Sequence, residues 1–390
     1  MNAPAAYDLA PLVPLLLVGA VFALAPLGWV IFRERRPTPS ARLQVLTWVT
    51  LFLTFDLVLF GAFTRLTDSG LGCPDWPGCY GHASPLGASG HIDAAQQSVP
   101  TGPVTHSKAW IEMTHRYLAT GVGALIVVLA VWNWIAARRR MTGTAPGIAL
   151  LTLVWVCLQG AFGALTVTMK LYPAIVTLHL LGGIGLLVLL ACQARPADPR
   201  PVVLPRSLLM GLWLLAGVAA VQMALGGWVS TNYAVLACSD FPTCQGAWWP
   251  PMDFGQAFSL RRELGAGAAG EYLPFAALTA IHMTHRLGAA VLLGLLAWLA
   301  WGLRNSNDAG ARRCAWPLAG VGLWQLMTGL GNVLLGWPLA AAVLHTGGAA
   351  ALAVVLTWAL CESRRDLAAQ TARASDNALG HNNNQRKAAA

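Results

Sequence analysis

The chain has 390 residues, of which 56% are hydrophobic and only 11% are charged, and its formal net charge is +9. Because soluble domains have about a quarter of their residues charged, this composition excludes an ordinary soluble protein and indicates a polytopic protein of the lipid bilayer. The net charge gives no reason to expect a nucleic acid partner, since a bias of basic residues toward one side of a membrane accounts for it.

Nine apolar stretches follow one another, each long enough to cross a hydrocarbon core, which takes about 20 residues. They lie at 10–32, 43–64, 108–136, 146–168, 172–193, 207–229, 274–302, 314–335 and 338–360. We predict nine transmembrane helices, because backbone amides that face lipid have no water to bond and the stretches are too uniformly apolar for barrel strands. The first stretch lacks a basic n-region, so we expect a retained helix rather than a cleaved signal peptide.

The basic residues predict the orientation of these helices. Most of the 25 lysines and arginines follow the first, third and fifth helices, lie between the seventh and eighth, or lie in the tail. Short cytoplasmic loops retain such residues, so the amino terminus is predicted outside and the carboxyl terminus in the cytoplasm. The long loops 66–107 and 230–273 are then both extracytoplasmic. The tail, residues 363–390, is predicted to be disordered.

The second half of the chain repeats the first. The matched features are Cys73 to Cys79 with Cys238 to Cys244, His115-Arg116 with His285-Arg286, and His179 with His345. Their offsets are 165 to 170 residues, which is the length of a domain rather than of a solenoid unit. We predict two tandem, pseudo-symmetric four-helix bundles, helices 2–5 within 41–195 and helices 6–9 within 206–362. Residues 1–40, with the first helix and a basic turn, stand outside the repeat.

Four of the eight cysteines lie in the two outer loops, on the side where disulfides persist. In each pair, five residues that include Asp, an aromatic residue and Pro form a tight turn that could bring the sulfurs together. For Cys238 and Cys244 a structural disulfide is favoured. For Cys73 and Cys79 a structural disulfide and a redox-active pair remain equally open. Zinc is less favoured, because the loops offer few further ligands.

Four histidines are predicted at one depth in the membrane. They are His115, His179, His285 and His345, each about seven to ten residues inside a helix that enters from the outside. At about 1.5 Å per residue, they lie roughly 10 Å or more below the outer surface. A single one would most simply form a hydrogen bond between helices. Two equivalent pairs favour two sites in which histidines of facing helices bind a haem iron from both sides.

The two halves differ beside the first histidine of each pair. Glu112 precedes His115 by three residues, whereas His282 precedes His285. Residues i and i+3 share a helix face, so Glu112 is predicted to point toward the same site as His115. It could accept a proton there, or it could hydrogen-bond a histidine or an arginine.

Arginines and glycines complete the predicted haem sites. Porphyrin propionates need cations, which Arg65, Arg116 and Arg286 could supply. Ser230 takes the place of Arg65 in the second half. Small residues that could let a flat ring approach the backbone are Gly121, Gly123, Gly182 and Gly183. The asymmetry predicts chemistry in the first half and a fixed cofactor in the second.

The residues from Thr64 to Pro77, Thr-Arg-Leu-Thr-Asp-Ser-Gly-Leu-Gly-Cys-Pro-Asp-Trp-Pro, carry a specific resemblance. Glu112-x-x-His115-Arg116, His179, His282-x-x-His285-Arg286 and His345 follow in order. Over about 40 to 362, the chain resembles the bacterial heme A synthases that have cysteine pairs in their outer loops. The resemblance implies an integral membrane oxidoreductase that converts the C8 methyl group of haem O to the formyl group of haem A by successive hydroxylations and loss of water.

The resemblance also implies residue roles. His285 and His345 would be the axial ligands of a resident haem b, with His282 and Arg286 beside them. The site for the substrate, haem O, would contain His115, His179, Arg65 and Arg116, and Glu112 would be its essential acid. Cys73 and Cys79 would form a functional disulfide, and Cys238 and Cys244 a structural one.

The implied product, haem A, is used by cytochrome c oxidase. The implied partners are therefore that oxidase or its assembly factors, heme O synthase (a farnesyltransferase), the lipid bilayer, and an unidentified electron donor or acceptor. The implied location is the cell inner membrane, with active sites near the extracytoplasmic face. A dihaem electron-transfer cytochrome is an alternative that the asymmetry disfavours. A haem exporter is a second, disfavoured because the histidines lie near one surface.

Overall fold

The computed structural model describes residues 7–32, 38–141, 144–194, 202, 204–266 and 272–388, with side chains described as far as residue 363. Eight helices in this part of the chain are long and apolar enough to cross a membrane. They are α1 (Leu12–Phe32), α2 (Pro39–Leu66), α4 (His106–Arg138), α5 (Pro146–Thr168), α6 (Pro173–Gln193), α7 (Arg206–Thr231), α9 (Phe275–Arg304) and the segment Leu339–Ser363 of α11 (Leu339–Ala388). The prediction of an all-α integral membrane protein is confirmed.

The ninth predicted helix is present as α10 (Ala309–Leu334), which is 26 residues long but is not among the eight. It begins before the predicted position 314, because the Asp308 side chain caps it by accepting the backbone N–H of Ala311 (2.8 Å). Polar residues such as Gln325 and Asn332 make it less apolar than the other helices. It packs between α9 and α11.

The other helix boundaries follow from capping residues. α2 starts at Pro39, earlier than predicted, because Thr38 accepts the N–H of Ala41 (3.2 Å) and Pro39 fits the first turn. Thr105 caps α4 in the same way, through the N–H of Lys108 (3.3 Å). Short elements between the long helices include α3 (Ser89–Ser98), a 3-10 turn η1 (Ala234–Ala237) and α8 (Phe254–Ala257).

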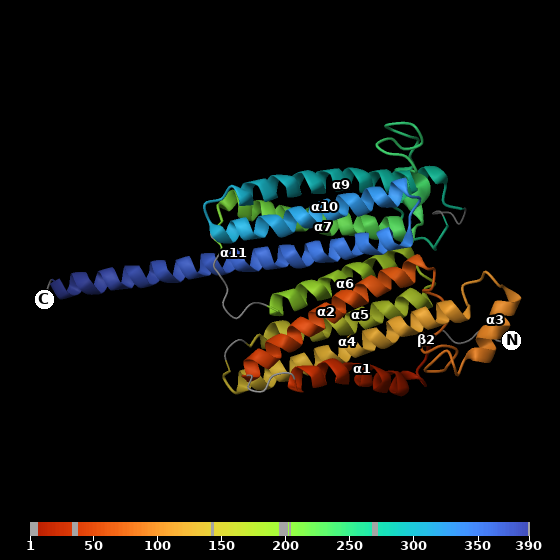
Figure 1. Ribbon diagram of the computed structural model, residues 1–390, viewed down its shortest axis with the longest axis horizontal. Coiled ribbons are helices and arrows are strands. Elements are labelled where there is room, and N and C mark those ends of the chain that lie inside the picture. Colours follow the sequence, from red (N-terminus) through yellow and green to blue (C-terminus); the bar gives the residue numbers. More distant parts are fainter. Residues whose placement is uncertain are drawn as a thin grey trace.

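The helices form two groups with α11 between them (Figure 1). One buried apolar cluster joins α1, α2, α4 and α6, and it includes Ala350, Ala353 and Val354 of α11. A second joins α7, α9, α10 and α11, and it includes Leu352 and Leu356. The two halves contact each other through α2, α6, α7 and α11. α11 therefore contributes to both cores.

A small parallel sheet ties the amino terminus to the first outer loop. Strand β1 (Tyr7–Asp8) pairs with β2 (Trp76–Pro77), and α1 packs on α4 and α2. The Tyr7 hydroxyl also lies 3.0 Å from the Thr168 hydroxyl at the end of α5. The extra first helix thus belongs to the first half.

The structure describes α11 as continuing without a break to Ala388, whereas disorder is predicted for residues 363–390. Figure 1 shows this helix extending past the ends of the others. Alanine, which has the highest helix propensity, is the commonest residue of the segment 363–388, and the segment contains no proline. Residues 389–390, and the basic segments 33–37 and 195–201, lie outside the described residues. The predicted orientation across the membrane stays a prediction.

Candidate functional site

The four predicted histidines lie on α4, α6, α9 and α11, and each ring packs over a glycine of a neighbouring helix. The pairs are His115 with Gly61, His179 with Gly163, His285 with Gly226 and His345 with Gly329. A Cβ atom added to these glycines would lie 3.0 to 3.3 Å from the ring. Gly226 follows Gly61 by 165 residues and Gly329 follows Gly163 by 166, within the offsets of the repeat. The two halves therefore bring an imidazole against a helix backbone in the same way.

The structure brings the histidines together in the predicted pairs. The ring centroids of His285 and His345 are 6.5 Å apart, with planes inclined by 81°. His115 and His179 are close enough for their imidazoles to interact electrostatically. The His115 ring also stacks on Phe60, with centroids 6.3 Å apart and planes within 9°. Each half therefore has two imidazoles from different helices at one place in its bundle.

Unsatisfied polar atoms beside the second pair fit the binding of a further group. Gln222 Oε1 and His282 Nδ1 are buried without a hydrogen-bond partner among the residues that the structure describes. Such atoms are uncommon in a finished protein interior. Two facing imidazoles also match the two axial positions of a haem iron. The residues of the second half thus fit a haem held by His285 and His345.

Glutamines that sequence reasoning missed contact three of the four histidines. Gln159 and Gln222 donate to the backbone carbonyl oxygens of His179 (2.6 Å) and His285 (2.9 Å). The available signal was spacing, because Gln159 and Gln325 are 166 residues apart, as are His179 and His345. Gln222 has no glutamine counterpart in the first half, so the spacing could not have found it.

The glycines predicted to admit a flat ring have other neighbours. Gly121 faces Phe22 of α1, where an added Cβ would lie 3.2 Å from the Phe22 Cβ. Gly182 and Gly183 face the Gln159 side chain, and Gly123 has open space beside it. That these positions lie against a porphyrin stays a prediction. The glycines that do contact the histidines lie on the facing helices.

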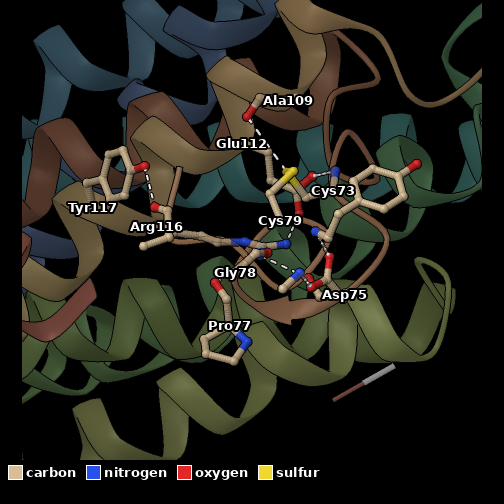
Figure 2. Close-up of a disulfide and its surroundings, with 12 residues drawn as sticks. Cys73, Asp75, Pro77, Gly78, Cys79, Ala109, Glu112, Arg116 and Tyr117 are labelled. Atoms are coloured by element: carbon tan, nitrogen blue, oxygen red, sulfur yellow. Dashed lines mark hydrogen bonds and ion pairs between the residues drawn. A yellow bond between two sulfur atoms is a disulfide. The ribbon is translucent and has the colours of Figure 1, made fainter. Parts of the chain in front are cut away.

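Glu112 connects α4 to the first disulfide loop (Figure 2). The side chain is buried, and its Oε2 accepts the backbone N–H of Cys73 (2.8 Å). Its Oε1 forms an ion pair with Arg116 one turn later. Both oxygens of the carboxylate are thus engaged with the loop and its arginine, which is the arginine-bonding role that the sequence left open.

Arg116 binds the first disulfide loop rather than a free surface. Its guanidinium donates to the carbonyl oxygens of Asp75 (3.0 Å), Pro77 (3.0 Å) and Gly78, and Figure 2 shows it between these carbonyls and Glu112. Cys73 and Cys79 close the loop as a disulfide. Charged hydrogen bonds to several carbonyls hold a loop firmly.

Asp75 holds the turn inside the same loop. It is buried, and its two oxygens accept the backbone N–H groups of Tyr80 (2.6 Å) and Gly81 (2.8 Å). Burial, together with the Asp75 carboxylate, raises the pKa of Tyr80. The turn is fixed from inside by Asp75 and from the membrane side by Arg116.

The second half has the same loop with one exchange. Cys238 and Cys244 form a disulfide, and Arg286 donates to the carbonyl oxygens of Cys238 (3.0 Å) and Thr243 (2.9 Å). In place of a carboxylate, His282 Nε2 lies 3.3 Å from Arg286 Nε. The first half therefore has an anion where the second has an imidazole.

Asp240 plays in the second loop the part of Asp75 in the first. Its oxygens accept from the Thr243 hydroxyl (2.6 Å) and from the backbone N–H groups of Gly246 (3.0 Å) and Gln245 (2.7 Å). These hydrogen bonds, led by that of Thr243, lower the pKa of Asp240 to about 2.

Arg65 lies where the outer ends of the two halves meet. Its guanidinium donates to the carbonyl oxygen of Ser230 (2.8 Å), its own counterpart in the repeat, and to the Tyr233 hydroxyl (2.9 Å). It also pairs with Asp68 (3.2 Å), which accepts from the same hydroxyl (2.6 Å). Like Arg116 and Arg286, it is committed to protein groups, and contact with propionates stays a prediction.

The sequence of this chain is similar to one family of known proteins. Residues 44–357 match the family described as cytochrome oxidase assembly protein. The Heme A synthase of Shewanella oneidensis is 39% identical over 319 residues, which cover 80% of this chain and 94% of that protein. The Heme A synthase of a Methylobacterium species is 30% identical, covering 83% and 92%. That of Halalkalibacterium halodurans is 26% identical, covering 78% and 90%.

Proposed function

Since this chain belongs to the cytochrome oxidase assembly protein family, we propose that it is a heme A synthase, an integral membrane oxidoreductase that converts the C8 methyl group of haem O to a formyl group. The observation that carries the proposal is the repeated pair of facing histidines with Glu112 in one half and His282 in the other. Two equivalent cofactor sites would explain why the histidine pairs repeat. Different chemistry in the two halves would explain why Glu112 in the first half is replaced by His282 in the second.

The second half is proposed to hold a resident haem b through His285 and His345. When bound there, this group supplies electron transfer to or from the substrate site. The chain holds the two rings in place with Gln222 on His285 and with the Thr328 hydroxyl, 2.9 Å from His345 Nδ1. His282 and Arg286 close this site toward the outer loop.

The first half is proposed to bind haem O between His115 and His179, with Glu112 as the proton acceptor. With water as the source of oxygen, each hydroxylation replaces a C–H bond by a C–O bond and releases two electrons and two protons. The electrons would leave through the resident haem to the unidentified acceptor, and a nearby base that takes up a proton favours the step. Oε1 of Glu112 is paired with Arg116, so Oε2, which also accepts the Cys73 N–H, would receive the proton on its second lone pair. Protonation there would weaken the contact with the Cys73 N–H, so the proton state of Glu112 is linked to the disulfide loop.

The chain is a multi-pass membrane protein of a family that acts in cytochrome oxidase assembly. We propose that it lies in the inner membrane with both haem sites near the extracytoplasmic face. Haem O would then be supplied by a farnesyltransferase, and haem A passed to cytochrome c oxidase or its assembly factors. The Cys73–Cys79 disulfide is proposed to be functional and the Cys238–Cys244 disulfide structural.

The test is to purify the full-length protein, extract its pigments and identify the porphyrins by mass. Haem O, haem A or a hydroxylated intermediate is expected together with haem b. The variant His285→Ala should lose the low-spin b-type spectrum while the first-half pigment remains. Haem b as the sole pigment would contradict the proposal and favour a dihaem electron-transfer cytochrome.

A further inference from the structure

Three of the four site histidines have a glutamine amide against Nδ1. Gln159 Nε2 lies 3.2 Å from His179 Nδ1, and Gln222 Nε2 lies 2.9 Å from His285 Nδ1. With the Gln325 amide oriented so that its oxygen accepts the N–H of Ala349 (2.8 Å), its Nε2 lies 2.9 Å from Nδ1 and 3.1 Å from the carbonyl oxygen of His345. In each case one amide contacts both the ring and the backbone of the histidine, which fixes the ring orientation.

Each of these contacts depends on a glycine three residues after the histidine. The glycines are Gly182 after His179, Gly288 after His285 and Gly348 after His345. A Cβ atom on Gly182 or Gly288 would collide with the amide oxygen of Gln159 or Gln222. One on Gly348 would lie 2.6 Å from Trp324 Cδ1 and 3.0 Å from the Gln325 amide. Glutamine and glycine therefore form a matched pair, in which the second makes room for the first.

His115 lacks both members of this pair. Leu57 lies four residues before Gly61, as Gln222 lies four residues before Gly226. Leu118 lies three residues after His115, as Gly288 lies three residues after His285. Within the residues that the structure describes, no hydrogen bond reaches the His115 ring, whose neighbours are Phe60 and Gly61. Leu57 thus replaces the glutamine, and Leu118 replaces the glycine that makes room for the glutamine side chain.

An amide at Nδ1 matters because iron binds the other nitrogen. When Nε2 is a ligand, the partner of Nδ1 sets the tautomer and the direction of the ring. The Gln222 Nε2 lies 2.9 Å from both Nδ1 and the carbonyl oxygen of His285, so one amide group holds the ring and the backbone of this histidine together. Loss of such a partner typically weakens a metal site by about 10- to 100-fold.

We propose that Leu57 and Leu118 make His115 an exchangeable haem ligand, whereas Gln222 and Gln325 are positioning residues that make the second-half ligands permanent. This inference rests on the proposed function, in which the first half takes up a substrate and releases a product. A site with one fixed and one unfixed imidazole can open by rotation of a single ring. A site with two fixed imidazoles holds its haem through every turnover.

Reciprocal exchange of these residues tests the proposal in the full-length, haem-loaded protein. The double variant L57Q/L118G installs the amide and its space at His115, and Q222L/G288L removes them from His285. Haem loss from each half is followed spectroscopically as transfer to excess apomyoglobin, and unfolding temperature is recorded in parallel. L118G alone is the matched control, because it creates the space without the amide.

L57Q/L118G should slow loss of the first-half haem by about tenfold or more relative to L118G, and Q222L/G288L should speed loss of the second-half haem by a similar factor. Unchanged rates in a folded L57Q/L118G protein would overturn the proposal. If that variant fails to fold, an unchanged rate in Q222L/G288L overturns it equally. The identity of the extracted first-half porphyrin is a separate result, so failure of the proposed function remains distinguishable.

Discussion

At the scale of single residues, the Glu112 carboxylate has a structural role in the first disulfide loop and a proposed role as proton acceptor. It holds the first disulfide loop through the Cys73 N–H, and it faces Arg116, which holds the rest of that loop. An uncharged isostere keeps the hydrogen bond from the Cys73 N–H but removes the charge that faces Arg116, so its effect on stability must be measured beside its effect on product.

Glu112→Gln should therefore retain haem and lose product. The glutamine oxygen can still accept the Cys73 N–H, but the amide cannot take up a proton, and general base catalysis is typically worth about 10²-fold or more. The measurement is the ratio of haem A to haem O in membranes, determined by mass. Glu263→Gln, in the other outer loop, is the control. Native amounts of haem A in the Glu112→Gln protein would show that its carboxylate is not the base.

The histidines and the cysteines could be found from the sequence because they recur at offsets of 165 to 170 residues, and Glu112 could be found because the second half has His282 in its place. The glutamines at Nδ1 could not be found in this way, because the sequence does not tell which neighbouring helix a polar side chain faces. The commitment of Arg116 to loop carbonyls was hidden for a similar reason, because its partners are backbone atoms without a sequence signature.

At the scale of elements, the amino-terminal strand makes the first outer loop different from the second. β1 pairs with β2 inside the Cys73–Cys79 loop, whereas the Cys238–Cys244 loop has no such strand in the part of the chain described. The first loop is the one that contacts the proposed catalytic carboxylate. α1 and β1 together brace the loop nearest the chemistry.

Removal of residues 1–9 should loosen this loop selectively. The deletion takes away β1 and keeps α1, and each lost hydrogen bond contributes about 1 kcal/mol. We expect a soluble thiol to reduce the Cys73–Cys79 disulfide several-fold faster, measured by alkylation and mass spectrometry. The Cys238–Cys244 disulfide in the same molecule is the internal reference. Equal acceleration of both would mean that the deletion disturbs the whole fold.

Hydropathy predicted the helices well because lipid imposes one strong requirement on every spanning segment. For the tail, polar composition predicts disorder, whereas the structure describes α11 as helical as far as Ala388. Hydropathy could not predict β1, since two residues carry no periodicity. The start of α10 was misplaced because Asp308, a capping residue, decides it rather than apolarity.

At the scale of the whole molecule, Arg65 joins the outer ends of the two bundles. It donates to the Ser230 carbonyl and the Tyr233 hydroxyl, and it lies over the Tyr233 ring at 4.2 Å. The contact links the end of α2 to the end of α7. It therefore fixes these two helix ends relative to each other.

Arg65→Ala should lower the unfolding free energy of the detergent-solubilised protein by about 1 kcal/mol, since the hydrogen bonds are charged but the Asp68 partner is exposed. Thermal unfolding gives the measurement. Tyr233→Phe removes only the hydroxyl and should cost less. A larger loss from Tyr233→Phe than from Arg65→Ala would show that the junction depends on the tyrosine instead.

The last helix of the chain completes both halves. Ala350 and Val354 of α11 enter the first core, Leu352 and Leu356 enter the second, and His345 on the same helix is a proposed ligand. During translation, every earlier helix is in the bilayer before α11 leaves the ribosome. Because neither core is complete before α11 is in place, we expect porphyrin to enter both proposed sites only after synthesis ends.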